Sequence, residues 1–418
     1  MELFVREDGK TLRCGYTTGT TAALASYAAA RLFLTKEGSP VVSLDIPAGI
    51  TVEAEVEVSE LIECMPGENQ NSPVSAVCGV RKDGGDDRDV TDGLLILAKI
   101  EPVKEGEARE PGNRGRRVII KAGEGIGTVT KPGLSVPVGE AAINPVPRKM
   151  IEDAVIKAME EAGFEGMLKC TVSVPEGKKA AASTFNERLG IVGGISIIGT
   201  TGIVEPMSRR AYSDAVCLEI RQQAAMGKKR LILTPGNYGE AFLKELLSEK
   251  PSCADEARAE AVRALREEFL TEQDELCAVM CSNFIGDALD EAIADDLERV
   301  MIVGHAGKLV KLAGGIMDTH SRTADCRMEL ICAHAAINGA SRELCERIMT
   351  SVTTDAAFDL LEEEDRDLRD GIVKSLMGAI SLHLRERVRK HERESSLKPE
   401  ALLFTIKDGE YRILGITE

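Results

Sequence analysis

Hydrophobic and polar residues alternate with a period of two in the first part of the chain. At 51–58, the sequence TVEAEVEV places valine or alanine at every second position, with glutamates between them. This pattern is typical of a strand with one buried and one solvated face. Further strands are expected at 74–81, 94–100, 116–121 and 168–174, and a helix near 148–163. The first part therefore predicts an α+β domain.

From about residue 189, continuous apolar runs alternate with helical patterns. The runs are ISIIG (195–199), LILTP (231–235), CAVMC (277–281) and VMIVG (300–304), with helical patterns near 208–226, 238–249, 255–271 and 283–297. Uninterrupted apolar strands alternating with helices are typical of a parallel sheet covered on both faces. We therefore expect an α+β domain at 1–188 and a doubly wound, mainly parallel-sheet α/β domain at 189–418.

The last hundred residues add helices and a hairpin. After Thr319 the pattern is mostly helical through residue 392, and Asp408-Gly409 then separates two apolar runs. An Asp-Gly pair in this setting predicts a tight β-hairpin.

Composition bounds the function classes. The chain has 418 residues, of which 43% are hydrophobic, so two packed domains are expected. The longest uncharged stretch, 189–204, contains five glycines and falls short of the ~20 apolar residues that span a bilayer. The N-terminal MELFVREDGK has no apolar core of signal-peptide length. We expect a cytoplasmic protein with no membrane partner.

Charge and cysteine usage narrow the partners. A net charge of −17, without a basic run or a tryptophan, argues against nucleic acid as a partner. Eleven cysteines without a Cys-x-x-Cys motif argue against a disulfide framework or a zinc ribbon. We expect Cys277 and Cys281 to pack as small hydrophobic residues, and no protein-bound metal.

Four glycine-containing loops follow the four apolar runs of the second part, at 199–208, 234–239, 281–286 and 304–308. In doubly wound sheets, ligands bind at the carboxyl ends of the strands. Glycine lets backbone amides approach a ligand, and the small polar residues beside it can recognise that ligand. A ligand site at this edge is therefore expected.

The last loop invites an ATP interpretation that the spacing excludes. A phosphate loop requires G-x-x-x-x-G-K-[ST], whereas only two residues separate Gly304 from Gly307, and Leu309 follows Lys308. GEGIG (123–127) likewise lacks the third glycine of a dinucleotide fingerprint.

Three other clusters carry candidate chemistry. The threonine turn Thr17–Thr20 precedes an alanine-rich helix, where threonine caps and free amides suit a carboxylate. The aspartate-rich loop 83–93 fails an EF-hand count and is either a solvated turn or part of a site. His305 and His320 flank Lys308 and Lys311, so they either are structural, bind carboxylates or transfer a proton.

Long segments of the chain resemble the cobalt-precorrin-5B (C1)-methyltransferase family of anaerobic cobalamin biosynthesis. The segments that carry the resemblance are LRCGYTTGTTAA (12–23), KDGGDDRDVTDG (82–93), GEGIGTVTKPGL (123–134), PVGEAAINPVPR (137–148), TFNERLGIVGGISIIGTTGIVEPMS (184–208), TPGNYG (234–239), SNFIG (282–286) and GHAGKLVKLAGGIMDTHS (304–321). The chain departs from the family pattern at Thr21, usually cysteine, Asp92, usually histidine, Arg88, often proline, and Ala306, often isoleucine.

The resemblance implies methyl transfer from S-adenosylmethionine to C1 of a cobalt-bound tetrapyrrole, giving cobalt-precorrin-6A and S-adenosylhomocysteine. It also implies that the cobalt arrives with the substrate, and that neighbouring pathway enzymes are possible transient partners. The reaction is an in-line displacement, so positioning and exclusion of water carry most of the catalysis.

The candidate residues are divided by role. Proton transfer is assigned to Asp86, Asp87, His305 and His320, without a choice among them. The donor is assigned to Gly199, Thr200, Thr201, Gly202, Gly236, Asn237, Asn283, Gly304 and Gly307. The tetrapyrrole is assigned to Thr17, Thr18, Gly19, Thr20, Lys308 and Lys311.

Two alternatives stay open. A non-catalytic carrier would bind the tetrapyrrole without the methyl donor, and a nucleotide-dependent enzyme would bind ATP.

Overall fold

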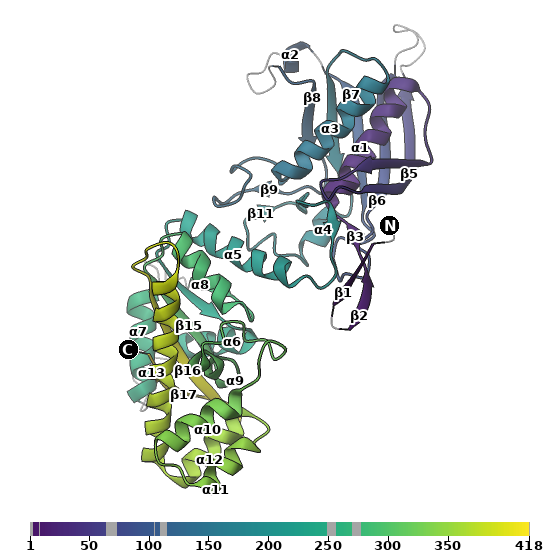
Figure 1. Ribbon diagram of the computed structural model, residues 1–418. Coiled ribbons are helices and arrows are strands. Elements are labelled where there is room, and N and C mark those ends of the chain that lie inside the picture. The colour runs from purple at the N-terminus through teal and green to yellow at the C-terminus, as the bar shows by residue number, and fades with distance from the viewer. Residues whose placement is uncertain are drawn as a thin grey trace. The chain divides into compact units, whose positions relative to one another are not determined.

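The computed structural model divides the chain into two compact units, Met1–Ser208 and Arg209–Glu418. It describes residues 3–7, 9–63, 73–103, 105–108, 115–248, 256–269 and 277–417. Both units combine helices with sheets, so the protein is a mixed α/β protein (Figure 1). Each unit is described by itself.

Unit 1 is built on a six-stranded mixed sheet in the order β4-β5-β6-β7-β10-β8. Its strands are β4 (Val41–Asp45), β5 (Thr51–Glu63), β6 (Pro73–Arg81), β7 (Leu95–Pro102), β8 (Val118–Ala122) and β10 (Leu168–Ser173). Neighbours are antiparallel except β8 and β10. The predicted alternation in β5 is confirmed, because Val52 and Ala54 are buried whereas Glu53 and Glu55 are exposed.

Two long helices, α1 (Thr18–Thr35) and α3 (Pro145–Glu161), lie side by side against this sheet (Figure 1). The buried side chains of both helices and of the strands form one core. The shorter elements of unit 1 are the hairpin β1 (Phe4–Glu7) and β2 (Lys10–Arg13), the pair β3 (Gly15–Tyr16) and β12 (Ile203–Val204), the pair β9 (Thr128–Val129) and β11 (Ile191–Val192), and the helices α2 (Glu105–Ala108) and α4 (Gly177–Ala181).

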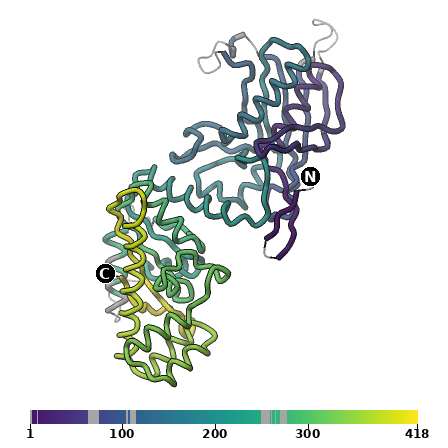
Figure 2. The backbone as a smooth tube through the Cα atoms, viewed as in Figure 1, coloured from purple at the N-terminus to yellow at the C-terminus, as the bar shows by residue number. Residues whose placement is uncertain are grey.

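Unit 2 contains a five-stranded sheet in the order β14-β13-β15-β16-β17. Its strands are β13 (Arg230–Thr234), β14 (Ala278–Met280), β15 (Arg299–His305), β16 (Lys398–Lys407) and β17 (Glu410–Ile416). All neighbours are parallel except the hairpin β16–β17. The predicted turn is confirmed at Asp408 and Gly409, whose φ angles are 53° and 82°. In the backbone trace, the C-terminal hairpin lies at one edge of the sheet, with β16 beside β15 (Figure 2).

Helices pack on both faces of this sheet. Successive residues of each strand face opposite sides, so they belong to different cores. Leu231 and Leu233 join one core with α8 (Ile285–Ala294) and α13 (Arg366–Lys390). Ile232, between them, joins another core with the helices that follow β13. Those two helices are α6 (Asn237–Ser248) and α7 (Glu256–Phe269). The remaining helices of unit 2 are α5 (Arg209–Ala225), α9 (Ala306–Leu309), the 3-10 helix Val310–Gly314, α10 (Arg327–Ile337), α11 (Arg342–Met349) and α12 (Thr354–Glu364).

The expected strand at 195–199 is not part of the parallel sheet. Ile195 and Ile197 instead form isolated bridges to Ile126 and Ile143, and all four side chains are buried in the core of unit 1. For this reason the division lies between Ser208 and Arg209 rather than between residues 188 and 189. The prediction of a continuous buried strand at 195–199 was therefore wrong. Ile195 and Ile197 are buried, whereas Ile198 is 50% exposed.

Among the residues that the structure describes, none of the helices is both long and apolar enough to cross a membrane.

Candidate functional site

The threonine turn of unit 1 is buried and bonded to the loop that was expected to hold the donor. Thr17 caps α1 by accepting the Thr20 amide, and its own amide donates to the Gly202 carbonyl. The Gly19 amide donates to the Ile198 carbonyl at 3.0 Å. Amides expected to contact a substrate carboxylate therefore already have partners within unit 1.

The hydroxyl groups of this turn are also occupied. Thr18 Oγ1 accepts the Ile198 amide at 2.9 Å, and Thr20 Oγ1 donates to the Gly202 carbonyl at 2.8 Å. Glycine is required at 199 and 202 because a Cβ there would lie 2.2 Å from Thr17 Oγ1 and 2.9 Å from Thr20 Oγ1, respectively. Thr200 and Thr201 are exposed. The threonines of 17–20 and the glycines of 199–202 are thus accounted for by contacts with each other. The sequence alone did not show that these two segments meet.

The aspartates of the 83–93 loop each have a partner. Arg13 makes a bidentate ion pair with Asp83, and its guanidinium hydrogen bonds hold the pKa of that carboxyl below its ordinary value. Asp86 and Asp87 accept the amides of Arg13 and Met207, respectively. The other two aspartates, 89 and 92, bond to Lys82 and the Gly84 amide.

These contacts give the loop a structural role. They relieve the mutual repulsion that the sequence implied, and they tie the loop to the segments near 13 and 207. Asp86 remains exposed.

Three of the four predicted loops converge in unit 2, at the carboxyl ends of β13, β14 and β15. We call the loops 234–237, 281–283 and 304–308 the strand-end loops. The Cys281 amide donates to the Thr234 carbonyl at 3.0 Å, and Lys308 Nζ donates to the Ser282 carbonyl at 3.3 Å. A Cβ on Gly236 would lie 3.4 Å from the same amine. The prediction of a shared edge is confirmed for these three loops.

Lys308 is the cation among the strand-end loops. It is partly buried, and burial lowers the pKa of its ammonium group. Among the described residues, no carboxylate lies within ion-pair distance of it. The neighbouring Cys281 thiol is not a counter-ion, because burial raises its pKa to about 12.

His305 has a structural arrangement on both ring nitrogens. Nδ1 accepts the Gly307 amide at 3.1 Å, so the proton lies on Nε2, which donates to Asp355 at 2.8 Å. Burial opposes ionisation of Asp355, but the hydrogen bonds from His305 and the Ile406 amide hold its pKa below the ordinary value. In this geometry His305 positions the loop and has no free nitrogen for proton transfer.

Lys311 and Asn283 stabilise the segment that follows the 3-10 helix. The buried Lys311 amine donates to the carbonyls of Thr319 and Ala324 at 3.0 and 2.8 Å. The Asn283 backbone carbonyl accepts the Thr319 amide, and its side-chain Oδ1 accepts the Thr319 hydroxyl. His320 Nδ1 accepts the Arg322 amide. These contacts give Lys311 and Asn283 a structural role that does not require a ligand.

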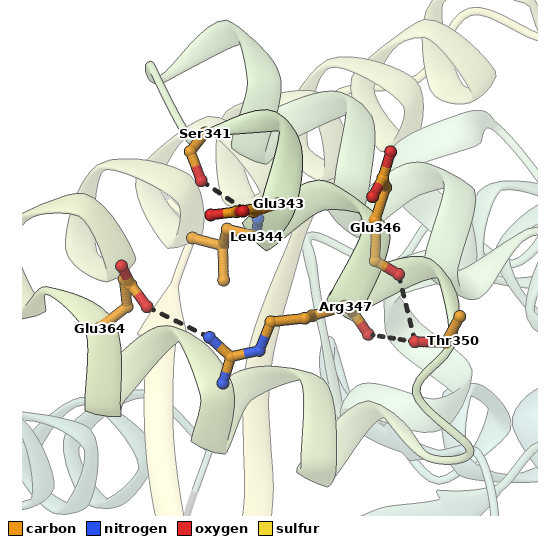
Figure 3. A pocket seen from close by; sticks show the side chains of 7 residues that line it. All are labelled: Ser341, Glu343, Leu344, Glu346, Arg347, Thr350 and Glu364. Atoms are coloured by element: carbon orange, nitrogen blue, oxygen red, sulfur yellow. Dashed lines mark hydrogen bonds and ion pairs between the residues drawn. The ribbon is translucent and has the colours of Figure 1, made fainter.

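Two cavities lie elsewhere and have acidic linings. One, of about 410 Å³, lies between α11 and α12 and is shown in Figure 3. Its residues are Ser341, Glu343, Leu344, Glu346, Arg347, Thr350 and Glu364. The other, of about 290 Å³, lies in unit 1 and is lined by Thr20, Ala23, Leu44, Asp45, Ile46, Pro47, Met150, Asp153, Ala154 and Lys157. Carboxylates outnumber cations in both, which disfavours a polycarboxylate ligand.

Sequence reasoning missed two neighbours of the strand-end loops. Tyr238 is 63% exposed, and its ring centroid lies 5.9 Å from that of His305. Asp355 comes from α12, fifty residues after the histidine that it holds. The only signal for Tyr238 was its place in TPGNYG, and Asp355 had none.

Comparisons with known proteins cover almost the whole chain. A family model described as CbiD matches residues 5–206, and one described as CbiD, C-terminal domain, matches residues 318–418. The cobalamin biosynthesis protein CbiD from Archaeoglobus fulgidus, a 1.9 Å crystal structure, is 28% identical. That match covers 78% of this chain and 88% of the other, with a TM-score of 0.37.

Curated relatives extend across both units. The cobalt-precorrin-5B C(1)-methyltransferase of Ruminiclostridium cellulolyticum is 40% identical over 388 residues, covering 93% of this chain and 88% of the relative. The protein of the same name from Treponema denticola is 37% identical over 410 residues, covering 98% and 99%. With this identity over nearly the full length of both proteins, the chain belongs to the cobalt-precorrin-5B C(1)-methyltransferase family.

Proposed function

We propose that this protein transfers the methyl group of S-adenosylmethionine to C1 of cobalt-precorrin-5B, giving cobalt-precorrin-6A and S-adenosylhomocysteine in anaerobic cobalamin biosynthesis. The observation that carries this proposal is the full-length match to relatives with that printed activity. The cobalt belongs to the substrate.

The strand-end loops are the proposed donor site. Ligands of parallel α/β sheets bind beyond the carboxyl ends of the strands, where the strand order reverses. Here β13 and β15 are neighbours. The chain passes from β13 to β14 at one edge of the sheet and from β15 to β16 toward the other edge. The loops after β13 and β15 contain Gly236, Asn237, Gly304 and Gly307.

The residues present fit such a donor. Gly236 has a φ of 129°. Among the described residues, apart from its chain neighbours, a Cβ there would meet only the Lys308 amine within 4 Å, so the glycine leaves space that a side chain would fill. Tyr238 offers an exposed ring beside that loop, suited to stacking on a planar base. When bound, S-adenosylmethionine supplies an electrophilic methyl group on a sulfonium sulfur, and the protein contributes orientation and exclusion of water.

Proton transfer from the macrocycle is proposed for fewer residues than the sequence offered. His305 has both ring nitrogens engaged and serves as a positioning residue. Asp86, which is exposed and accepts one backbone amide, and His320 remain the candidates. Asp87 also accepts one backbone amide, that of Met207, but it is less exposed than Asp86, and we assign it a structural role.

The direct test incubates the purified chain with cobalt-precorrin-5B and S-adenosylmethionine carrying a labelled methyl group. The expected result is one labelled methyl on the tetrapyrrole and one equivalent of S-adenosylhomocysteine. Calorimetry with both cosubstrates and ATP separates the alternatives. Tetrapyrrole binding without donor binding would favour the carrier, and ATP binding would favour the nucleotide-dependent enzyme.

A further inference from the structure

Among the described residues, Lys308 has fewer hydrogen-bond partners than Lys311, the buried lysine nearby in unit 2. The Lys311 amine, a few residues away, donates to two carbonyls and lies 3.9 Å from Asp325. The Lys308 amine donates to one carbonyl, that of Ser282, at 3.3 Å. The protein therefore supplies hydrogen-bond acceptors for the Lys311 amine, whereas it supplies too few for the Lys308 amine.

The cost of this arrangement is a desolvated charge. Removing an ammonium group from water is unfavourable unless other groups replace the lost hydration. Burial lowers the pKa of Lys308, and the positive charge of Lys311 acts in the same direction. An amine with three donors and one protein acceptor has capacity for two further hydrogen bonds.

The Lys308 amine borders the space beside Gly236. A Cβ built on that glycine would lie 3.4 Å from Lys308 Nζ and, apart from the adjoining residues 235 and 237, within 4 Å of nothing else among the described residues. A ligand atom placed beside Gly236 would therefore lie close to the amine.

We propose that Lys308 binds the carboxylate of the donor's methionine moiety and thereby selects donors that carry it. This inference rests on the proposed function. A carboxylate can accept hydrogen bonds from the amine and supply the missing counter-charge. The donor's sulfonium, which is also cationic, would have to lie away from Lys308, so the interaction would fix the donor's orientation as well as its affinity.

The test compares S-adenosylmethionine with decarboxylated S-adenosylmethionine, which lacks only the carboxylate. Calorimetry on the full chain gives a dissociation constant for each ligand. A charge-assisted hydrogen bond predicts a preference of roughly 10- to 100-fold for the carboxylate form in the natural protein. In Lys308→Met the preference is expected to fall to about unity.

The ratio of the two constants is the decisive readout. A general disturbance of the loops weakens both ligands together and leaves the ratio unchanged, whereas loss of a carboxylate contact removes it. Lys374→Met, an exposed lysine of α13, is the matched control and should keep the natural preference. If Lys308→Met fails to fold, Lys308→Gln serves the same purpose.

The outcomes separate this inference from the proposed function. A preference that persists in Lys308→Met overturns the role of Lys308 and leaves the methyltransferase proposal intact. An unchanged donor ratio combined with a raised KM for the tetrapyrrole also overturns it, because the amine would then contact the substrate. Failure of the natural protein to bind either donor form, with the tetrapyrrole present, contradicts the proposed function itself.

Discussion

The threonine turn of unit 1 and the strand-end loops of unit 2 are alike in composition. They differ in whether their polar groups already have hydrogen-bond partners in the protein. Both are rich in glycine and small polar residues. Gly199, in the segment bonded to the threonine turn, and Gly236, in the strand-end loops, have φ angles of 130° and 129°. In unit 1, the Thr17 side chain fills the space beside Gly199. In unit 2, the corresponding space is bordered by an underbonded lysine.

This difference shows that a glycine-threonine motif does not by itself identify a binding site. A turn can need glycine because its own chain approaches closely, or because a ligand does. The two cases are separated by identifying the hydrogen-bond partner of each backbone amide, because an amide that already donates to the protein is not free to donate to a ligand.

The largest effect is expected for Gly199→Ala. Alanine is strained at a φ of 130°, and its Cβ would lie 2.2 Å from the Thr17 hydroxyl that caps α1. Strain and loss of the cap together predict that unit 1 loses about 3 kcal/mol or more of unfolding free energy. Hydrogen exchange of α1, followed by mass spectrometry, measures the loss.

Gly236→Ala is the matched variant in unit 2. Its φ of 129° carries the same strain, but in the described part of the chain its Cβ would meet only the Lys308 amine beyond its chain neighbours. We expect a loss of about 1–3 kcal/mol, from strain alone, together with weaker donor binding. A larger loss of protection in β13 of this variant than in α1 of Gly199→Ala would contradict the comparison.

Thr18→Val tests whether the threonine turn is structural. Valine keeps the shape of threonine, but the Ile198 amide loses its hydroxyl acceptor beside a side chain that is 2% exposed. We expect a loss of about 1–3 kcal/mol in the free energy of unfolding, with the KM for the tetrapyrrole unchanged. A raised KM at unchanged stability would return the turn to the substrate site.

Local sequence patterns predicted the elements well. The alternation in β5, the Asp408-Gly409 turn and the three apolar strands of unit 2 depend on residues close in sequence, so their pattern determines them. The run 195–199 failed for a tertiary reason. Its apolar residues require burial, but nothing in them specifies whether Ile126 and Ile143 or a strand of unit 2 provides it.

The candidate site was predictable only in outline. Parallel topology places the loops after β13, β14 and β15 at one edge, and the structure brings them together. The sequence could not show that Gly202 and Ile198 form hydrogen bonds with the threonine turn, or that Asp355 bonds to His305. It also could not show that the Lys308 amine has a single hydrogen-bond acceptor among the described residues. Each of these depends on segments brought together only by folding.

The pH dependence of stability sharpens the account of Lys308. Burial places its pKa in the folded protein below the ordinary value of 10.5, so the unfolded chain binds more protons between those two values. The unfolding free energy should therefore rise with pH through that window. Lys308→Met should lack this contribution, whereas the contribution of Lys311 is present in both proteins. Denaturant unfolding of both, from about pH 8 to about pH 10.5, measures the difference. A difference that does not change with pH would contradict a desolvated amine at this position.

The smallest effect is expected at the acidic cavity of unit 2. The Arg347–Glu364 pair spans 3.3 Å, and both side chains are about half exposed (Figure 3). Water screens such a pair, so Arg347→Ala should change the unfolding free energy by less than about 1 kcal/mol. The KM values for donor and tetrapyrrole should be unchanged, because the cavity's three glutamates would repel substrate carboxylates. Glu364→Gln removes the other partner and serves as the control. If Arg347→Ala alone weakens tetrapyrrole binding at unchanged stability, this cavity rather than the strand-end loops would contribute a cation to the anionic ligand.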